Sequence, residues 1–372
     1  MYIASQFMPL IYLLILPLFV LADFHASAQP SNNAEVLLKT AQALINNDPA
    51  KAREVHKQAI KAFEQERYSD TFSLQLLLFN GRYYNRLSQY DSSILICDQV
   101  YKKAIKVDAF KIAAEASAQK GIAYEMLGQY RLAAIAYFEA YRIYESTKFA
   151  LGVMNQSLNL GLIYQIQKKY KIAESYFNKA RILADSINDQ QGYIASINNL
   201  GINYTELKQY PQALKYFSLV LDFDLKSGDS INIADSYNNV GVSYLLLKEY
   251  NKAILFLNKS AGIKKRIDNI KGYANTINNL AEAYIYVNTE RVLPMLDEAL
   301  SIAEKYTLLD VRAENFRIRH IYYNQIGNYK LAYEAIKLMH AYNDSLRLNE
   351  LNLEIDQLNK QSEWQKKPEA LN

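Results

Sequence analysis

Apolar residues recur along this chain at the spacing of amphipathic helices. Gly201, Tyr204 and Leu207 are three residues apart, and Ala213 and Phe217 follow at a spacing of four. Side chains three or four residues apart lie on one face of an α-helix. The pattern therefore predicts a first helix around Gly201 and a second around Ala213, joined by a short turn.

This helical pair recurs at a period of 40 residues, with a last step of 39. The position that is glycine in five consecutive copies is occupied by Gly81, Gly121, Gly161, Gly201, Gly241, Ala281 and His320. A tyrosine follows three residues after all seven positions and nine residues after six of them, so 13 of the 31 tyrosines are predicted packing residues. Because one helical pair cannot bury its apolar face alone, the sequence predicts stacked pairs. The expected fold is all-α, a right-handed α-solenoid of about eight helical hairpins with a C-terminal helix.

The repeat resembles the tetratricopeptide repeat (TPR). The family pattern is matched in one copy by Leu160, Gly161, Tyr164, Tyr170, Ala173, Phe177 and Ala180. The resemblance covers residues 31–342, but the period is 40 where the common repeat has 34, and Ser157 stands where the family has tryptophan. It implies a non-catalytic scaffold that binds a protein or an extended peptide in a concave groove lined by the first helices.

Asparagine is the recurrent polar residue of the predicted first helices. Two residues before the glycine position lie Asn159, Asn199, Asn239 and Asn279. An asparagine amide both donates and accepts hydrogen bonds, so a row of them can pair with a peptide backbone of any sequence. Peptide-binding TPR proteins use asparagine here, and the resemblance implies a groove role for these four residues. Asn155, Asp235 and Asn275 lie one turn earlier on the same face, so we include them in the predicted groove. The alternative is that the asparagines link neighbouring first helices.

Two local features depart from the regular repeat. Copy seven has Glu290 in place of tyrosine and Pro294 inside its expected second helix, which indicates either divergence near the array end or a kink that shapes a binding surface. Arg312, Arg317 and Arg319 form a basic stretch in the last copy. They are either a solvated face or contacts for an anionic ligand.

Composition and motifs disfavour several other functions. Half of the residues are apolar and 22% are charged, which excludes a disordered chain. The net charge of +4 comes from basic clusters interleaved with acids, so no nucleic acid is expected as a partner. Motifs of nucleotide, zinc and hydrolase sites are lacking. His56 and Cys97 fall where other copies carry core residues, and we expect no catalytic residue, no cofactor and no metal.

An export signal is predicted at the N-terminus. Met8–Ala22 is an apolar run of 15 residues followed by small residues at Ala26 and Ala28, the pattern of a signal peptide cleaved before Gln29. A membrane span needs about 20 apolar residues, so an uncleaved anchor is the less favoured alternative. We expect residues 1–28 to be removed, no membrane span in the mature chain, and a periplasmic or secreted protein.

The C-terminal stretch is predicted to be a polar helix over residues 343–363, followed by a tail over 364–372. Leu348, Leu351, Ile355 and Leu358 are spaced by three and four residues. This pattern favours a helix that caps the last repeat, or a short coiled coil that mediates self-association through residues 348–358. The arrangement resembles the periplasmic TPR regions of bacterial sensor proteins. The alternative function is therefore a sensory input module, truncated or partnered, of a two-component histidine kinase or transcriptional regulator.

Overall fold

The computed structural model describes residues 33–65 and 69–365, with side chains through residue 348. In these ranges the regular structure is entirely helical, with 16 α-helices, a 3-10 helix and no strand. Consecutive α-helices form antiparallel hairpins, and the predicted all-α repeat solenoid is confirmed. The predicted signal segment 1–28 and residues 366–372 of the predicted tail lie outside the described residues.

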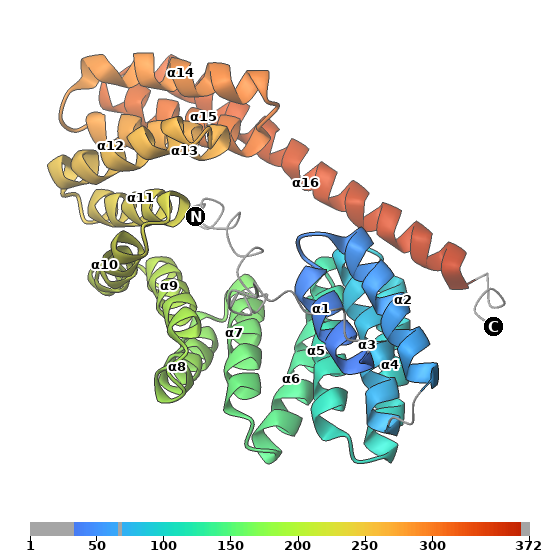
Figure 1. Cartoon of the computed structure of the whole chain (residues 1–372). Coiled ribbons are helices and arrows are strands. Elements are labelled where there is room, and N and C mark those ends of the chain that lie inside the picture. Colours follow the sequence, from blue (N-terminus) through green and yellow to red (C-terminus); the bar gives the residue numbers. More distant parts are fainter. Residues whose placement is uncertain (1–32, 66–68, 366–372) are drawn as a thin grey trace. The chain divides into compact units, whose positions relative to one another are not determined.

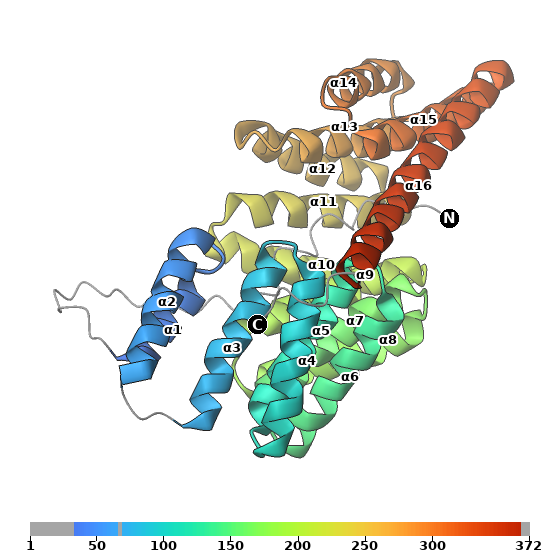
Figure 2. The same cartoon turned by 90° about the vertical axis from the view of Figure 1, so that its right-hand side faces the viewer.

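The chain divides into two compact units between Gly192 and Tyr193. The N-terminal unit contains α1 (Ala34–Leu44), α2 (Pro49–Gln65), α3 (Asp70–Arg86), α4 (Tyr90–Lys106), α5 (Phe110–Met126), α6 (Tyr130–Ser146), α7 (Ala150–Ile166) and α8 (Tyr170–Ser186). In Figures 1 and 2, consecutive helices of this unit lie side by side. Odd-numbered helices are the first, and even-numbered helices the second, of each hairpin.

The C-terminal unit, Tyr193–Asn359, continues the same alternation. It is formed by α9 (Gln190–Glu206), whose first turn precedes the division, α10 (Tyr210–Ser227), α11 (Ser230–Leu246), α12 (Tyr250–Arg266), α13 (Ile270–Tyr284), the 3-10 helix η3 (Thr289–Arg291), α14 (Val292–Lys305), α15 (Leu309–Gln325) and α16 (Tyr329–Gln365).

The 40-residue period arises from helices of nearly constant length. Helices α3 to α9 each have 17 residues, and three-residue turns separate them. Left-handed backbone conformations recur every 20 residues, at Ser88, Asp108, Gly128, Lys148, Lys168, Asn188, Lys208, Gly228, Lys248 and Asp268. After Lys208, the N–H of Gln209 donates to the carbonyl of Tyr204 at 2.8 Å, a bond typical of a Schellman helix end. The repeat exceeds the common length because its helices are longer.

The glycine position is a point of tight packing between the two helices of a hairpin. A Cβ atom on Gly241 would lie 2.7 Å from Cγ of the buried Leu257. Cys97 occupies the same place over Gly81, where a Cβ atom would lie 2.5 Å from its sulfur. In the five copies with glycine, the residue therefore leaves room for the core residue 16 positions later in the chain.

The recurrent tyrosines of hairpins two to six pack between helices, as the pattern predicts, whereas Tyr329 of the last hairpin is exposed. Tyr204 stacks on Tyr216 and Tyr164 on Tyr176, each pair with ring centroids 5.5 Å apart. The tyrosine nine residues after the glycine position is the first residue of each regular second helix, as Tyr250 is in α12. Such offset-stacked pairs add to the free energy gained by burying their rings.

The seventh hairpin has an irregular turn and no break in its second helix. Helix α13 has 15 residues, and η3 replaces the left-handed turn residue found in hairpins two to six and in hairpin eight. Pro294 is the third residue of α14, where a backbone N–H has no partner within the helix. Helix α14 therefore continues through Pro294, and the departure from the regular repeat lies in the preceding turn.

The C-terminal helix is continuous with the last hairpin. Helix α16 spans Tyr329–Gln365, 37 residues, and crosses the boundary placed by the sequence at 342/343. No glycine or proline occurs between Tyr329 and Gln365 to end it. The helix expected over 343–363 is thus the second half of α16, which extends beyond the other helices of its unit (Figure 1).

Candidate functional site

The four predicted groove asparagines lie on four successive first helices. Asn159 is on α7 in the N-terminal unit, whereas Asn199, Asn239 and Asn279 are on α9, α11 and α13 in the C-terminal unit. Asn159 is 4% exposed, Asn199 8% and Asn279 2%, while Asn239 is half-buried. The side chains are thus recessed, and their hydrogen-bond partners decide what each can do.

Asn279 links two first helices. Its Nδ2 donates to Oδ1 of Asn238 on α11 at 3.2 Å, and that oxygen also accepts from the Thr276 hydroxyl at 3.2 Å. Asn159 makes a longer bond within its own helix, to Oε1 of Gln156 at 3.4 Å. Asn279 therefore fits the alternative interpretation, in which the asparagines link neighbouring first helices.

Asn199 and Asn239 differ from these. Within the described part of the chain, neither side-chain amide has a hydrogen-bond partner. The same holds for Asn155 on α7 and Asn275 on α13, which are half-buried. Because each amide has two donors and an acceptor, these four positions can engage an external backbone.

Asp235, the acidic member of the predicted groove, is neutralised from the second helix of its hairpin. Lys264 on α12 places Nζ 2.9 Å from Oδ1 of Asp235, with side chains 5% and 15% exposed, respectively. The same ammonium lies 3.4 Å from the Thr276 hydroxyl. This surface of α11 is therefore close to neutral, and Asp235 positions Lys264.

The basic stretch of the last hairpin is also internally compensated. Arg317 pairs with Glu282 on α13 and with Glu314 one turn earlier on α15. Burial raises the pKa of Glu314, against the opposing effect of Arg317. Arg319 pairs with Asp297 of α14. Both sequence-based interpretations are thus wrong for these two arginines, which are neither a solvated face nor free for an anion.

Arg312 likewise makes contacts within the fold. Its guanidinium donates to the backbone carbonyls of Ala303 and Glu304, at 3.2 and 3.0 Å. These carbonyls belong to the last turn of α14, where a cation also interacts favourably with the helix dipole.

Three further polar residues lie on first helices of the N-terminal unit, and the sequence analysis did not single them out. Among the described residues, the buried atoms Arg82 Nε and Asn85 Oδ1 on α3 and Gln165 Nε2 on α7 have no hydrogen-bond partner. Arg82 does donate through Nη2 to Glu115 at 2.8 Å. The signal was present in the sequence, because these residues stand one or four positions after the glycine position.

The titratable core residues are unsuited to catalysis. Cys97 is fully buried, and burial raises the pKa of its thiol to about 12, so the reactive thiolate is scarce at neutral pH. Burial lowers the pKa of His56 to about 4, and its Nε2 lies 2.9 Å from the Leu76 carbonyl. Both residues are core fillers, which confirms their predicted placement. Across residues 33–65 and 69–365, no group of three His, Cys, Asp or Glu side chains is arranged to hold a metal ion.

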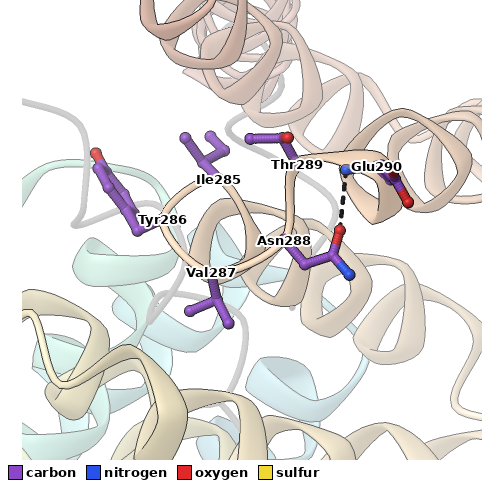
Figure 3. Close-up of a pocket in the computed structure, with 6 residues that line it drawn as sticks. All are labelled: Ile285, Tyr286, Val287, Asn288, Thr289 and Glu290. Carbon is purple, nitrogen blue, oxygen red and sulfur yellow. Dashed lines mark hydrogen bonds between the residues drawn. The ribbon is translucent and has the colours of Figure 1, made fainter.

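A shallow hollow lies at the irregular turn of the seventh hairpin (Figure 3). It is lined by Ile285, Tyr286, Val287, Asn288, Thr289 and Glu290. Oδ1 of Asn288 accepts from the backbone N–H of Glu290 at 3.2 Å, which starts η3. One of the lining residues, Tyr286, stacks on Tyr250 with ring centroids 4.3 Å apart. The hollow is therefore formed by six consecutive residues around a single turn.

Comparison with known sequences identifies the repeat. Residues 153–226 and 193–266 match the sequence profile of the tetratricopeptide repeat family. No curated protein sequence matches the chain significantly. No helix in the described ranges combines the length and apolar character needed to cross a membrane.

Solved structures share the fold at low sequence identity. The apo form of RapI is 16% identical, with a TM-score of 0.67 over 84% of this chain and 98% of that one. A signal transduction ATPase with a tetratricopeptide repeat sensor, from Pyrococcus horikoshii, is 14% identical with a TM-score of 0.65 over 86% of this chain and 49% of that one. NprR in complex with its cognate peptide NprX is 15% identical, with a TM-score of 0.52 over 87% and 99%.

Proposed function

The chain is a tetratricopeptide repeat protein, and on that premise we propose that it is an exported, non-catalytic scaffold that binds an extended peptide or protein segment along its first helices. One observation carries the proposal: the recessed amide of Asn199 has no hydrogen-bond partner among the described residues. An amide without a partner in the fold keeps its two donors and its acceptor available. A ligand backbone supplies the missing donor and acceptor.

The spacing of the amides suits an extended chain. Asn199 and Asn239 are one repeat apart in the same unit, and neighbouring helices pack with axes roughly 8–10 Å apart. Three residues of an extended peptide span roughly 10 Å. Successive asparagines therefore meet backbone groups about three peptide residues apart. NprR, which has this fold, was solved with a bound peptide.

The neutral character of the surface indicates what it recognises. The paired Asp235 and Lys264 leave no net charge beside the Asn239 position, so backbone hydrogen bonds rather than ion pairs supply the affinity there. We infer that the ligand is bound chiefly through its main chain.

The test uses a display library of random decapeptides as the probe. Peptides enriched on the wild-type chain are titrated against the Asn199→Ala/Asn239→Ala double variant. We expect binding at least tenfold weaker, because each lost hydrogen bond contributes about 0.5–1.5 kcal/mol.

The matched control is Asn178→Ala/Asn258→Ala. These asparagines lie on second helices, where their amides donate to carbonyls of their own helices, Glu174 and Ile254. The control should bind like the wild type. Equal affinity of the groove double variant, with an unchanged thermal unfolding curve, contradicts the proposal, as does failure to enrich any peptide.

Export is tested separately. We propose that the signal is cleaved before Gln29, which predicts a mature chain that begins at that residue. Intact mass measurement of the protein in the envelope or medium of its host checks this. A chain that keeps residues 1–28 and stays in the cytosol contradicts export and leaves the binding proposal standing.

A sensory input module is the second candidate. It is favoured by the unbroken passage of the last hairpin into the 37-residue helix α16, since a rigid helix can transmit movement from a binding array. The neighbour from Pyrococcus horikoshii uses its repeat as a sensor. This function predicts a membrane segment and a kinase encoded beside this chain. Sequencing the adjoining reading frame checks it, and neighbours without these features contradict it.

A further inference from the structure

The last hairpin leaves one face of α16 uncovered. Its residues are Tyr329, Tyr333, Ile336 and His340, here called the end face. Tyr329 is 72% exposed, Tyr333 is 65% exposed and His340 is also exposed, while Ile336 is half-buried. Large aromatic side chains are normally buried in a packed array, so this exposure requires an explanation.

Earlier hairpins show what usually covers these positions. The equivalents of Tyr329, which are Tyr90, Tyr130, Tyr170, Tyr210 and Tyr250, are all half-buried. The equivalents of Tyr333 and His340 are also half-buried or buried in those five hairpins. Tyr250 shows the mode of contact, because its ring stacks on Tyr286 of the next hairpin at 4.3 Å. The end face is therefore a hairpin-to-hairpin packing surface without its next hairpin in the described chain.

The same helix carries an apolar stripe beyond the end face. Earlier second helices such as α12 end 25 residues after the glycine position, which corresponds to Ser345 in α16. Helix α16 continues to Gln365, an extension of about 30 Å at 1.5 Å per residue. Its sequence has apolar residues at 348, 351, 355 and 358, and Leu348 is exposed.

We propose that two copies of this chain associate through α16, packed antiparallel, so that the extension of each copy covers the end face of the other. When the two helices run antiparallel, the residue spacings of the end face match those of the apolar stripe on the partner's extension to within one residue. In this register, helix position 329 of one copy lies beside position 358 of the other, 333 beside 355, 336 beside 351 and 340 beside 348. The paired residue numbers add to 687 or 688 throughout, which places a two-fold axis near Asp344.

The geometry of one helix permits both stripes to face the same partner. At 100° per residue, the mean directions of the two stripes on α16 differ by about 50°, within the roughly 100° width of an apolar helix face. Each extension thereby takes the place of the first helix of a ninth hairpin. The contact is isologous and closes after two copies, as expected for a two-fold interface.

The register brings a charged residue of each copy together. Asp344 is exposed and lies next to the proposed axis, so the two carboxylates repel each other in the dimer. Neutralising Asp344 should therefore increase the affinity of the two copies for each other. The affinity of a dimer formed through any other surface should not depend on the charge of Asp344. This effect makes the proposal specific to the antiparallel register.

Light scattering and sedimentation of the full chain over a wide concentration range provide the test. We expect a wild-type dimer, a Tyr333→Glu variant whose association is at least about tenfold weaker, and an Asp344→Asn variant that associates several-fold more tightly at low salt. Tyr306→Glu is the matched control, because Tyr306 is an exposed tyrosine outside the end face.

Each outcome decides the proposal. A monomeric wild type at every concentration overturns it, and so does a dimer that tolerates Tyr333→Glu or is weakened by Asp344→Asn. Tyr333 is exposed, so its substitution should leave the thermal unfolding of the monomer equal to that of Tyr306→Glu. Peptide binding by the first helices is unaffected by either result.

Discussion

Phe217 lies directly over Gly201, and a Cβ atom on that glycine would be 2.7 Å from the phenylalanine ring. The ring is almost fully buried and cannot move away without displacing its neighbours. We expect Gly201→Ala to lower the free energy of unfolding by about 1–3 kcal/mol through overpacking. Denaturant unfolding monitored by circular dichroism measures the change.

Gly262 in α12 provides the control. A Cβ atom there meets nothing within 4 Å, so Gly262→Ala should raise the free energy of unfolding by about 0.5–1 kcal/mol through helix propensity alone. If both substitutions stabilise the chain, the Phe217 ring does not pack against Gly201 as tightly as the 2.7 Å distance indicates.

Lys248 shows a different glycine effect, since it occupies a left-handed turn position with a φ of 61°. A residue with a side chain is disfavoured there by roughly 1–2 kcal/mol. Lys248→Gly should therefore increase stability, by up to about 1 kcal/mol after the greater entropy of unfolded glycine is included. Thermal unfolding checks this. Lys252→Gly, within α12, should instead destabilise by about 1 kcal/mol.

These two sites show what the sequence reveals about the fold. The spacing from Gly201 to Phe217 predicts the hairpin and its core, because close helix packing imposes a small residue at a fixed distance from a large one. The left-handed turn at Lys248 is not evident from residue type, since Ser, Asp, Lys, Asn and Gly all occupy the equivalent positions. The constant length of the helices imposes the left-handed conformation at each turn. In the sequence, the only sign of it is the regular repeat period of 40 residues.

The stability of the N-terminal unit should depend on the protonation of His56. Its pKa is 6.5 in the unfolded chain and about 4 in the fold, where burial disfavours the imidazolium. Between these values the unfolded state binds more protons, so the free energy of unfolding rises with pH. Stability is fully present above about pH 6.5 and declines as the pH falls toward about 4.

The variant His56→Phe isolates this effect. Phenylalanine keeps the stacking on Phe79, whose ring centroid is 4.1 Å away, and cannot titrate. Unfolding measured at several pH values between 4 and 8 should show a smaller acid-side loss in the variant than in the wild type. Parallel curves would mean that His56 titrates as it does in the unfolded chain.

Lys264 and Asp235 should be strongly coupled. Lys264→Met leaves the Asp235 carboxylate without its ammonium partner 2.9 Å away, and we expect a loss of about 2 kcal/mol or more. In a double-mutant cycle with Asp235→Asn, the coupling energy should exceed about 1 kcal/mol. The exposed pair Glu249–Lys252, 2.5 Å apart, should give less than about 0.5 kcal/mol.

This pair also shows why the site was less predictable than the fold. Asp235 falls in the predicted groove register, but its partner Lys264 comes from the next helix, and no spacing rule links them. Likewise, the sequence places Asn199 and Asn279 in equivalent positions. Asn279 donates a hydrogen bond to Asn238, which lies 41 residues earlier in the chain. The residue 41 positions before Asn199 is Leu158, whose side chain cannot accept a hydrogen bond. A tertiary neighbour, not the residue itself, decides which amide remains available.

The hydrogen bonds between hairpins span short stretches of chain. Asn238 and Asn279 are 41 residues apart, and Glu282 and Arg317 are 35 apart. Folding therefore closes only small loops, and it can begin at any hairpin and spread to its neighbours. A duplication of 40 residues adds a hairpin without lengthening any loop that must close. The number of hairpins is consequently free to change over evolutionary time while each local interface is retained.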